Sequence, residues 1–165
     1  MENAEFTMSD IELGGSITCT SGSDTGGFLG RNWTEIGGTI SDVTISEDGA
    51  TYSAKGCFGA LLGKVTSKVN KRLTLQNILL NNLTVNANDQ KSRCSLLVQN
   101  AQNLILEVID YDSTGCVVNN PGSNFDEIAG QTKSNNDSLG STYSTGIVSV
   151  HSTTKGNFHA YYYKN

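Results

Sequence analysis

Residues 26–30 (GGFLG) place two apolar residues between glycines, and residues 59–63 (GALLG) repeat this arrangement further along the chain. The spacing from Leu29 to Leu62 is 33 residues. Glycine on either side of an apolar pair lets the backbone turn sharply, because glycine adopts conformations that a Cβ atom forbids. A sharp turn that recurs at such a period is typical of folds that stack one unit on the next. The sequence therefore predicts a stacked architecture.

A longer apolar segment follows each of these turns. Residues 40–45 (ISDVTI) and 75–80 (LQNILL) are 35 residues apart when counted from Ile40 to Leu75. A strand over the first segment would set Ile40, Asp42 and Thr44 on one face against Ser41, Val43 and Ile45 on the other. The second also fits the spacing of an amphipathic helix, but its asparagines and the neighbouring β-branched residues favour a strand. A third, degraded unit follows over residues 94–109.

The composition supports an all-β fold class. Of the 165 residues, 36% are hydrophobic and only 16% are charged, so most of the polarity comes from Ser, Thr, Asn and Gly. Helical proteins favour Glu, Lys, Ala and Leu, whereas this composition suits strands and tight turns. The length is sufficient for one hydrophobic core. A β-sandwich stays open as an alternative architecture, since alternating strands with a turn about every ten residues also suit it.

The charge balance excludes some classes of partner. The net charge is −5 and the pI is near 4.9, whereas nucleic-acid binding needs Lys and Arg clustered over a broad face. No apolar run approaches the roughly 18 residues of a membrane span, and the acidic start of the chain does not resemble a signal peptide. One basic stretch departs from this trend, and it contains Lys64, Lys68, Lys71 and Arg72. We interpret it as a solvated loop, with a contact to an anionic glycan or to a partner protein as the alternatives.

The character of the sequence changes after residue 116. Residues 119–122 (NNPG) are a strong turn signal, and a long polar region follows them. Two alternating runs, residues 146–151 and 158–163, then surround a glycine-containing turn and predict a closing β-hairpin. We therefore expect repeats over residues 1–116, followed over residues 117–165 by a polar loop and a hairpin that caps an open sheet end.

The repeat resembles a known family. Residues 26–32 (GGFLGRN) followed by residues 38–42 (GTISD) resemble the GLUG-type repeat of bacterial surface proteins, in which Gly-Leu-Val-Gly-x-Asn leads to Gly-x-Ile-x-Asn. Residues 58–63 keep the glycines of this pattern but not its asparagine, and residues 94–100 keep less of it. The resemblance implies that each unit is a rung of a right-handed parallel β-helix, in adhesins and other exported proteins. It implies a short solenoid of about three rungs and a location outside the cell, on the cell surface or on a virion.

No cluster of reactive residues is evident in the sequence. The two histidines, His151 and His159, lie on the predicted hairpin among Thr and Tyr, and the four cysteines are dispersed without a CxxC pair, so we expect no catalytic triad, metal or cofactor. The alternative is an acid cluster of Glu107, Asp110 and Asp112. Asp110 and Asp112 would face one side of a strand, where two carboxylates can act as a pair or bind Ca²⁺.

Aromatic side chains provide the best surfaces for stacking on a sugar ring or packing on a protein partner. Trp33 lies in a predicted loop, Tyr161 and Tyr163 lie on the predicted hairpin, and Tyr111 adjoins the acid cluster. Trp33, Tyr161 and Tyr163 join the basic stretch as candidate binding residues.

We predict a non-enzymatic structural or adhesive module of a bacterial surface protein or a phage-type fibre. It would bind a glycan or a surface protein through its loops and an exposed face, and it would self-associate through sheet edges or by end-to-end stacking. The first alternative is a carbohydrate-active β-helix of the polysaccharide lyase or hydrolase kind that uses the acid cluster. The second is a lectin-like β-sandwich.

Overall fold

The computed structural model describes residues 5–20, 25–33, 37–46, 49–55, 58–87, 94–119, 125–126, 128 and 147–151. Within these residues the fold is all-β, as the composition predicts, and it contains no helix. The strands form three sheets, which we call sheets A, B and C, and every pairing between described strands is parallel. The segment that also fitted a helix is part of a strand, so the strand prediction is confirmed.

Sheet A contains the longest strands of the chain. Its order is β1-β6-β9-β12-β15, with β2 also paired to β6 and β5 to β9. Its members are β1 (Phe6–Met8), β2 (Ile11–Leu13), β5 (Leu29–Trp33), β6 (Gly38–Ile45), β9 (Leu62–Leu80), β12 (Val98–Asp112) and β15 (Ile147–His151).

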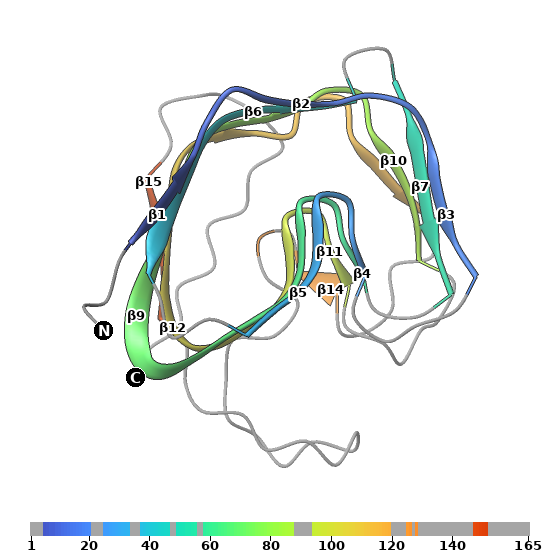
Figure 1. Cartoon of the computed structure of the whole chain (residues 1–165). Helices are drawn as coiled ribbons and strands as arrows, with labels where there is room; N and C mark the ends of the chain where they lie inside the picture. Colours follow the sequence, from blue (N-terminus) through green and yellow to red (C-terminus); the bar gives the residue numbers. More distant parts are fainter. Residues whose placement is uncertain are drawn as a thin grey trace.

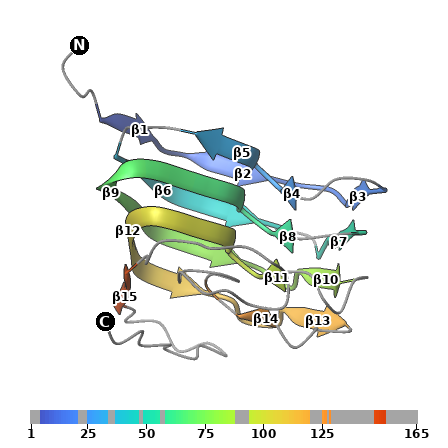
Figure 2. The ribbon, with the colours of Figure 1, turned by 90° about the horizontal axis from the view of Figure 1, so that it is seen from below.

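Sheets B and C consist of shorter strands, which are stacked in the same layer order as the strands of sheet A. Sheet B runs β13-β10-β7-β3, with β3 (Ile17–Cys19), β7 (Thr51–Ala54), β10 (Thr84–Ala87) and β13 (Val117–Asn119). Sheet C runs β14-β11-β8-β4, with β4 (Thr25–Gly26), β8 (Phe58–Gly59), β11 (Cys94–Ser95) and β14 (Phe125–Asp126). The chain passes from sheet A to sheet B to sheet C and back to sheet A, and Figure 2 shows the resulting layers.

The sequence repeat corresponds to the pairing between these layers. Leu29 pairs with Leu62, and Ile40 pairs with Leu75, so both predicted spacings place their residues on neighbouring strands. Inward-facing apolar residues therefore lie above one another from layer to layer. Ile40, Leu75 and Val108 form one such column, and each is at most 1% exposed. Burying these columns between the sheets supplies the main favourable term in folding.

A tight turn at the centre of the molecule, which we call the central turn, connects sheet C to sheet A (Figure 1). The N–H of Phe28 donates to the carbonyl oxygen of Leu61 at 2.9 Å, and the N–H of Leu61 donates to that of Leu97 at 3.1 Å. The two glycine-bracketed apolar steps are therefore neighbours in adjacent layers. This confirms the expectation that they bend the chain at equivalent points.

A second bend divides the long strands of sheet A. Asp10, Asp42, Asn77 and Asp110 all have a positive φ, between 53° and 57°. The register places them in one column, which we call the Asp/Asn column, because the residues on either side of them pair across the layers. Asn and Asp tolerate this left-handed conformation better than other residues that carry a side chain. The pairing passes over the column residues and resumes in the same register on their far side, so the chain changes direction at this column with the layers still aligned.

The basic stretch is not a loop, because residues 64–72 belong to β9. Residues 64–66 and 71–72 pair with β12, and the register shift between Gln102 and Leu104 passes over residues 67–70. Trp33 likewise ends β5 instead of lying in a loop. Parallel pairing continues past residue 116 in β13, β14 and β15, and the second run of the predicted hairpin, residues 158–163, lies outside the described residues.

Candidate binding surface

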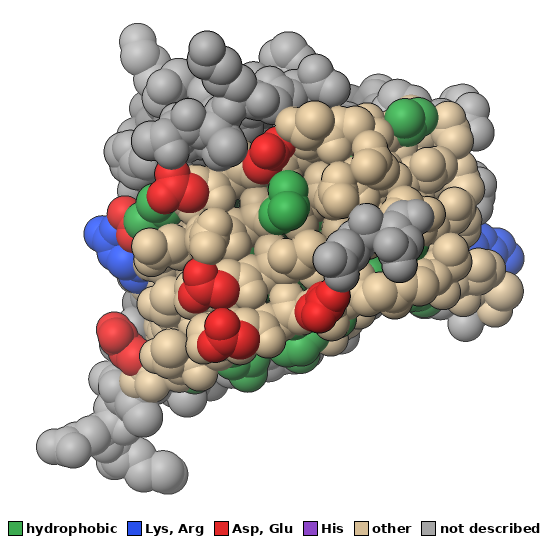
Figure 3. Space-filling model, turned by 90° about the horizontal axis from the view of Figure 1, so that it is seen from above, with side chains coloured by type: hydrophobic (Ala, Val, Ile, Leu, Met, Phe, Trp, Pro, Cys, Tyr) green, Lys and Arg blue, Asp and Glu red, His purple; other side chains and the backbone are tan. Residues whose placement is uncertain are grey.

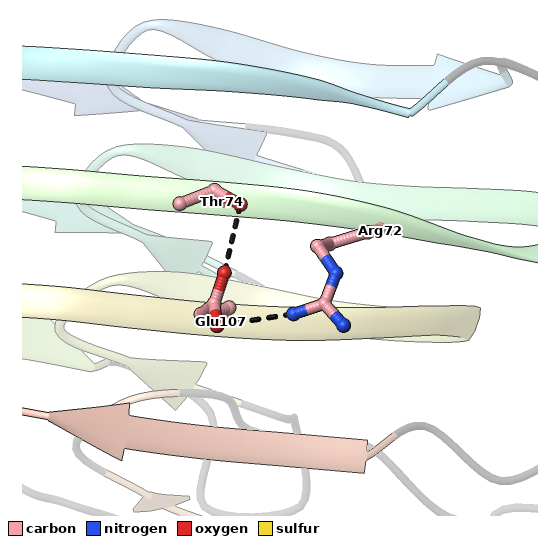
Figure 4. A network of polar contacts seen from close by, with 3 residues as sticks. All are labelled: Arg72, Thr74 and Glu107. Atoms are coloured by element: carbon pink, nitrogen blue, oxygen red, sulfur yellow. Dashed lines mark hydrogen bonds and ion pairs between the residues drawn. The ribbon is translucent and has the colours of Figure 1, made fainter.

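Two members of the predicted acid cluster have different partners. The Glu107 carboxylate forms an ion pair with the Arg72 guanidinium at 3.0 Å and accepts a hydrogen bond from the Thr74 hydroxyl at 3.1 Å (Figure 4). Asp112 accepts hydrogen bonds from the N–H and the hydroxyl of Thr114, at 2.8 and 2.6 Å, and so ends β12 in a turn. Glu107 and Asp112 therefore have structural contacts of their own.

Asp110 belongs to the Asp/Asn column, which is a polar edge on the outside of the molecule. The Asn77 side-chain amide donates to the Asp42 carboxylate at 2.7 Å, and the hydroxyl of Ser41 donates to the same carboxylate at 2.8 Å. The hydrogen bond from Asn77, and then that from Ser41, lowers the pKa of Asp42 below its usual 3.8, because both bonds favour the charged form. Tyr111, proposed above as a sugar platform, is fully buried, so that interpretation is wrong.

The face that extends beyond this column carries mostly acidic charge. In Figure 3, acidic side chains are scattered over a largely uncharged surface, and Lys and Arg lie at its margins. The acidic residues of this face lie in the Asp/Asn column or in the strand residues that follow it. They are Asp10, Glu12, Asp42, Asp110 and Asp112. Among the described residues, no three His, Cys, Asp or Glu side chains are grouped so that they could hold a metal ion. We call this surface the acidic face.

The basic stretch does not form a free cationic patch in the described part of the chain. Arg72 is exposed and engages Glu107, and Lys64 is partly buried within β9. The side chains of Lys68 and Lys71 lie outside the described part, although their backbone belongs to β9. The same holds for the side chain of Trp33, and Tyr161 and Tyr163 lie wholly outside the described residues.

The outer surface of sheet B is uncharged, and most of its side chains, arranged in two ranks, are hydroxyl or amide groups. The first rank contains Thr51 and Thr84, and the exposed apolar side chain of Val117 continues it through the register of β7, β10 and β13. We call this surface the hydroxyl–amide face, and its second rank contains Thr18, Ser53, Asn86 and Asn119.

Hydrogen bonds link the second rank from layer to layer. The amide of Asn119 donates to the side-chain oxygen of Asn86 at 2.9 Å, and the amide of Asn86 donates to the hydroxyl of Ser53 at 3.0 Å. These bonds hold the side chains in register at the spacing of parallel strands, about 4.8 Å. The face therefore presents donors and acceptors in regular order, with no Lys, Arg, Asp or Glu among its members.

A cavity of about 280 Å³ lies where sheet A turns into sheet B at the first layers. Glu12, Ser16, Ser46 and Gly49 are among its lining residues. The Ser46 hydroxyl accepts the N–H of Ala50, and the Ser16 hydroxyl accepts that of Thr51 at 3.0 Å. Because both hydroxyls serve the backbone of the turn, this cavity is a structural feature of the bend.

Inspection of the sequence missed the hydroxyl–amide face, although a signal for it is present. The triplets SIT at residues 16–18, TYS at 51–53 and TVN at 84–86 place an apolar residue between polar ones near the period of the repeat, and VVN at 117–119 keeps the last two positions of this pattern. Aligning these triplets by the repeat would have shown one polar column on the outside of the sheet.

No protein-family model, curated protein or solved structure matches this chain. The described residues include no helix with the length and apolar character needed to cross a membrane.

Proposed function

We propose that this chain is a non-enzymatic structural and adhesive module, built as a short right-handed parallel β-solenoid, that binds a neutral polysaccharide on its hydroxyl–amide face. The observation that supports it best is the two-ranked, uncharged surface of sheet B on a stack of parallel strands. Such modules project from bacterial surface proteins or phage-type fibres, and we place this one in the same setting, outside the cell.

The chemistry of the hydroxyl–amide face favours a long, uncharged polymer. A single hydrogen bond exchanged with water contributes only about 0.5–1.5 kcal/mol, so one sugar unit would bind weakly. A polysaccharide repeats its hydroxyl groups along the chain and can engage several layers at once, which multiplies the affinity. The acidic face and the net charge of −5 disfavour an anionic polymer. A neutral polysaccharide fits these conditions better than the anionic glycan considered for the basic stretch.

The alternative of a polysaccharide-cleaving enzyme has less support. Paired catalytic carboxylates need a shared substrate between them, with separations of about 5–9.5 Å across the bond that breaks. Here Glu107 is neutralised by Arg72, and Asp112 is bonded to Thr114. The lectin-like sandwich also has less support, since sandwiches are built from antiparallel sheets and the described pairings are parallel.

The proposal is tested by sedimentation with insoluble neutral polysaccharides. We expect the wild-type chain to bind at least one of them, and the double variant Thr84→Ala/Asn86→Ala to bind roughly tenfold more weakly, the loss of about 1.4 kcal/mol. Thr39→Ala is the matched control, because Thr39 is a partly exposed threonine on sheet A. Thermal unfolding of each variant confirms that the fold is retained.

Two results would contradict the proposal. One is the absence of binding by the wild-type chain to every neutral polysaccharide tested. The other is equal binding by the double variant and the Thr39 control. Release of soluble sugar by the wild type, lost in Asp110→Asn/Asp112→Asn, would favour the enzyme instead.

A further inference from the structure

The hydroxyl–amide face is longer across the strands of sheet B than along them. Each strand has two outward positions on this face, such as Thr84 and Asn86 of β10, which lie about 6.6 Å apart at the rise of a parallel strand. Across the strands, the second rank runs from Thr18 to Asn119, roughly 14 Å for three strand spacings. Figure 2 shows β3, β7, β10 and β13 stacked in this direction. A linear polymer therefore meets more of the polar side chains of this face when it lies along the stack.

The side-chain hydrogen bonds of the second rank leave polar groups for a ligand. A side-chain amide has two N–H groups and an oxygen with two lone pairs. Asn86 uses one N–H on the Ser53 hydroxyl and one lone pair on the amide of Asn119. Its second N–H and second lone pair remain for a partner outside the protein, and the residue is only partly buried. Because the two existing bonds already hold this amide in place, binding a ligand to it costs little further ordering.

Sugar hydroxyls match these groups in chemistry and in spacing. A hydroxyl both donates and accepts, so two neighbouring hydroxyls of one sugar residue can satisfy the second N–H and the second lone pair of an amide such as that of Asn86. The layers repeat at about 4.8 Å, which is close to the length of one sugar ring with its linking oxygen in an extended chain. A sugar residue that is rotated relative to its neighbour still presents a hydroxyl, since the ring carries hydroxyls on both edges. One sugar residue can therefore bind at each layer.

We infer that the hydroxyl–amide face binds an extended, unbranched, neutral glycan that lies along the stack, with successive sugar residues on successive layers. The inference rests on the proposed function, whose polysaccharide it specifies by shape and by direction on the face. A coiled glycan would turn away from the straight rank, and a branch would hold neighbouring sugar residues off the surface. Because each added sugar residue engages one more layer, the affinity should depend on the length of the glycan.

Titration calorimetry of the full chain with soluble oligosaccharides of two to six sugar residues tests this. The probes are β-1,4-linked oligosaccharides of glucose, N-acetylglucosamine, mannose and xylose, whose chains are extended, and α-1,4-linked oligosaccharides of glucose, whose chains coil, are the comparison. For at least one extended series, we expect the affinity to rise about threefold or more for each sugar residue added from two to four, the increment of one or two hydrogen bonds. Four sugar residues correspond to the four described strands of sheet B. A glycan that lies along one strand meets only two outward positions, so its affinity would stop rising at two.

Two variants at opposite ends of the second rank distinguish the two directions. Thr18 and Asn119 lie on the outermost described strands of sheet B, and both are exposed. We expect Thr18→Ala and Asn119→Ala each to weaken binding of the four-residue oligosaccharide about threefold, the loss of roughly one hydrogen bond. Binding of the two-residue oligosaccharide should change less than about twofold, because it can occupy the layers that remain. Thr39→Ala on sheet A is again the matched control, and thermal unfolding confirms that each variant keeps the fold.

Several outcomes would overturn the inference while the proposed function stands. These are an affinity that stops rising at two sugar residues, equal or tighter binding of the coiled series, four-residue binding that neither end variant weakens, and binding of an insoluble polysaccharide without binding of any oligosaccharide. Absence of binding to every neutral glycan, soluble or insoluble, would contradict the proposed function and the inference together.

Discussion

The central turn and the Asp/Asn column bend the chain by different physical means. At the central turn, a Cβ on Gly26 would overlap the carbonyl oxygen of Leu29, and a Cβ on Gly59 would overlap that of Leu62 and the backbone nitrogen of Gln99. At the Asp/Asn column the side chains point outward and carry the polar groups that bond to one another. Glycine is needed at the first bend for space, and Asp or Asn suits the second for conformation and hydrogen bonding.

The two bends therefore tolerate different substitutions. Neighbouring backbone surrounds the central turn, and backbone cannot move aside as a flexible side chain can. The outer bend faces water, so a change there costs the energy of one strained residue and one or two hydrogen bonds. The central turn should therefore be the more sensitive of the two to substitution.

The largest expected effect comes from Gly59→Ala at the central turn. The added methyl group would overlap backbone atoms of its own layer and of the next, so two layers must shift. We expect a loss of roughly 3–4 kcal/mol in the free energy of unfolding, at the upper end for a single substitution. Denaturant unfolding measures it.

Gly14→Ala is the matched control for this prediction. No atom lies within 4 Å of a Cβ built at Gly14, so its effect should stay within about 0.5 kcal/mol. Equal stabilities of the two variants would show that the central turn has room for a side chain, and the steric account of the glycines would be wrong.

A smaller effect is expected from substitutions of Asn77 in the Asp/Asn column. Both Asn77→Ala and Asn77→Gly remove the amide that donates to Asp42, but only alanine carries a Cβ in the left-handed conformation. We expect the alanine variant to be less stable than the glycine variant by about 1 kcal/mol, since left-handed backbone costs roughly 1–2 kcal/mol for a residue with a Cβ. Thermal or denaturant unfolding of the two variants gives the difference directly. A more stable alanine variant would contradict the conformational role of this position.

The Asp/Asn column also explains why the sequence admitted a helix at residues 75–83. Leu75 and Ile78 are both buried although three positions apart, because the left-handed Asn77 between them turns the strand and restarts its alternation. Ile40 and Val43 have the same spacing around Asp42. An i, i+3 spacing of apolar residues around a single Asn or Asp therefore does not distinguish a bent strand from a helix. The asparagines that made a helix unfavourable were the correct signal.

Local sequence was a poorer guide to the basic stretch than to the turns. Lys and Arg with no acidic residue among them suggest a solvated loop when a stretch is taken alone, yet residues 64–72 are within β9. The backbone pairs with β12 and β5 at residues 64–66 and with β12 at residues 71–72, so the ladder on either side of the register shift determines the conformation whatever the side chains. Glycine turns and buried columns depend on local residue types and were predictable. Pairing of a polar segment depends on its neighbours in the stack and was not.

The smallest expected effect concerns the titration of Asp42, and it separates hydrogen bonding from conformation at the outer bend. Because the pKa of Asp42 is lowered in the folded protein, its charge contributes stability above the ordinary pKa of 3.8, and this contribution is lost as the pH falls through the folded value. In Asn77→Gly the donor is gone while the backbone is relaxed, so the pKa of Asp42 should rise toward 3.8. Ser41→Ala should raise it less, since the Asn77 bond has the larger effect. NMR titration of the Asp42 carboxyl carbon measures both shifts, and an unchanged pKa in Asn77→Gly would show that this column is held by backbone conformation alone.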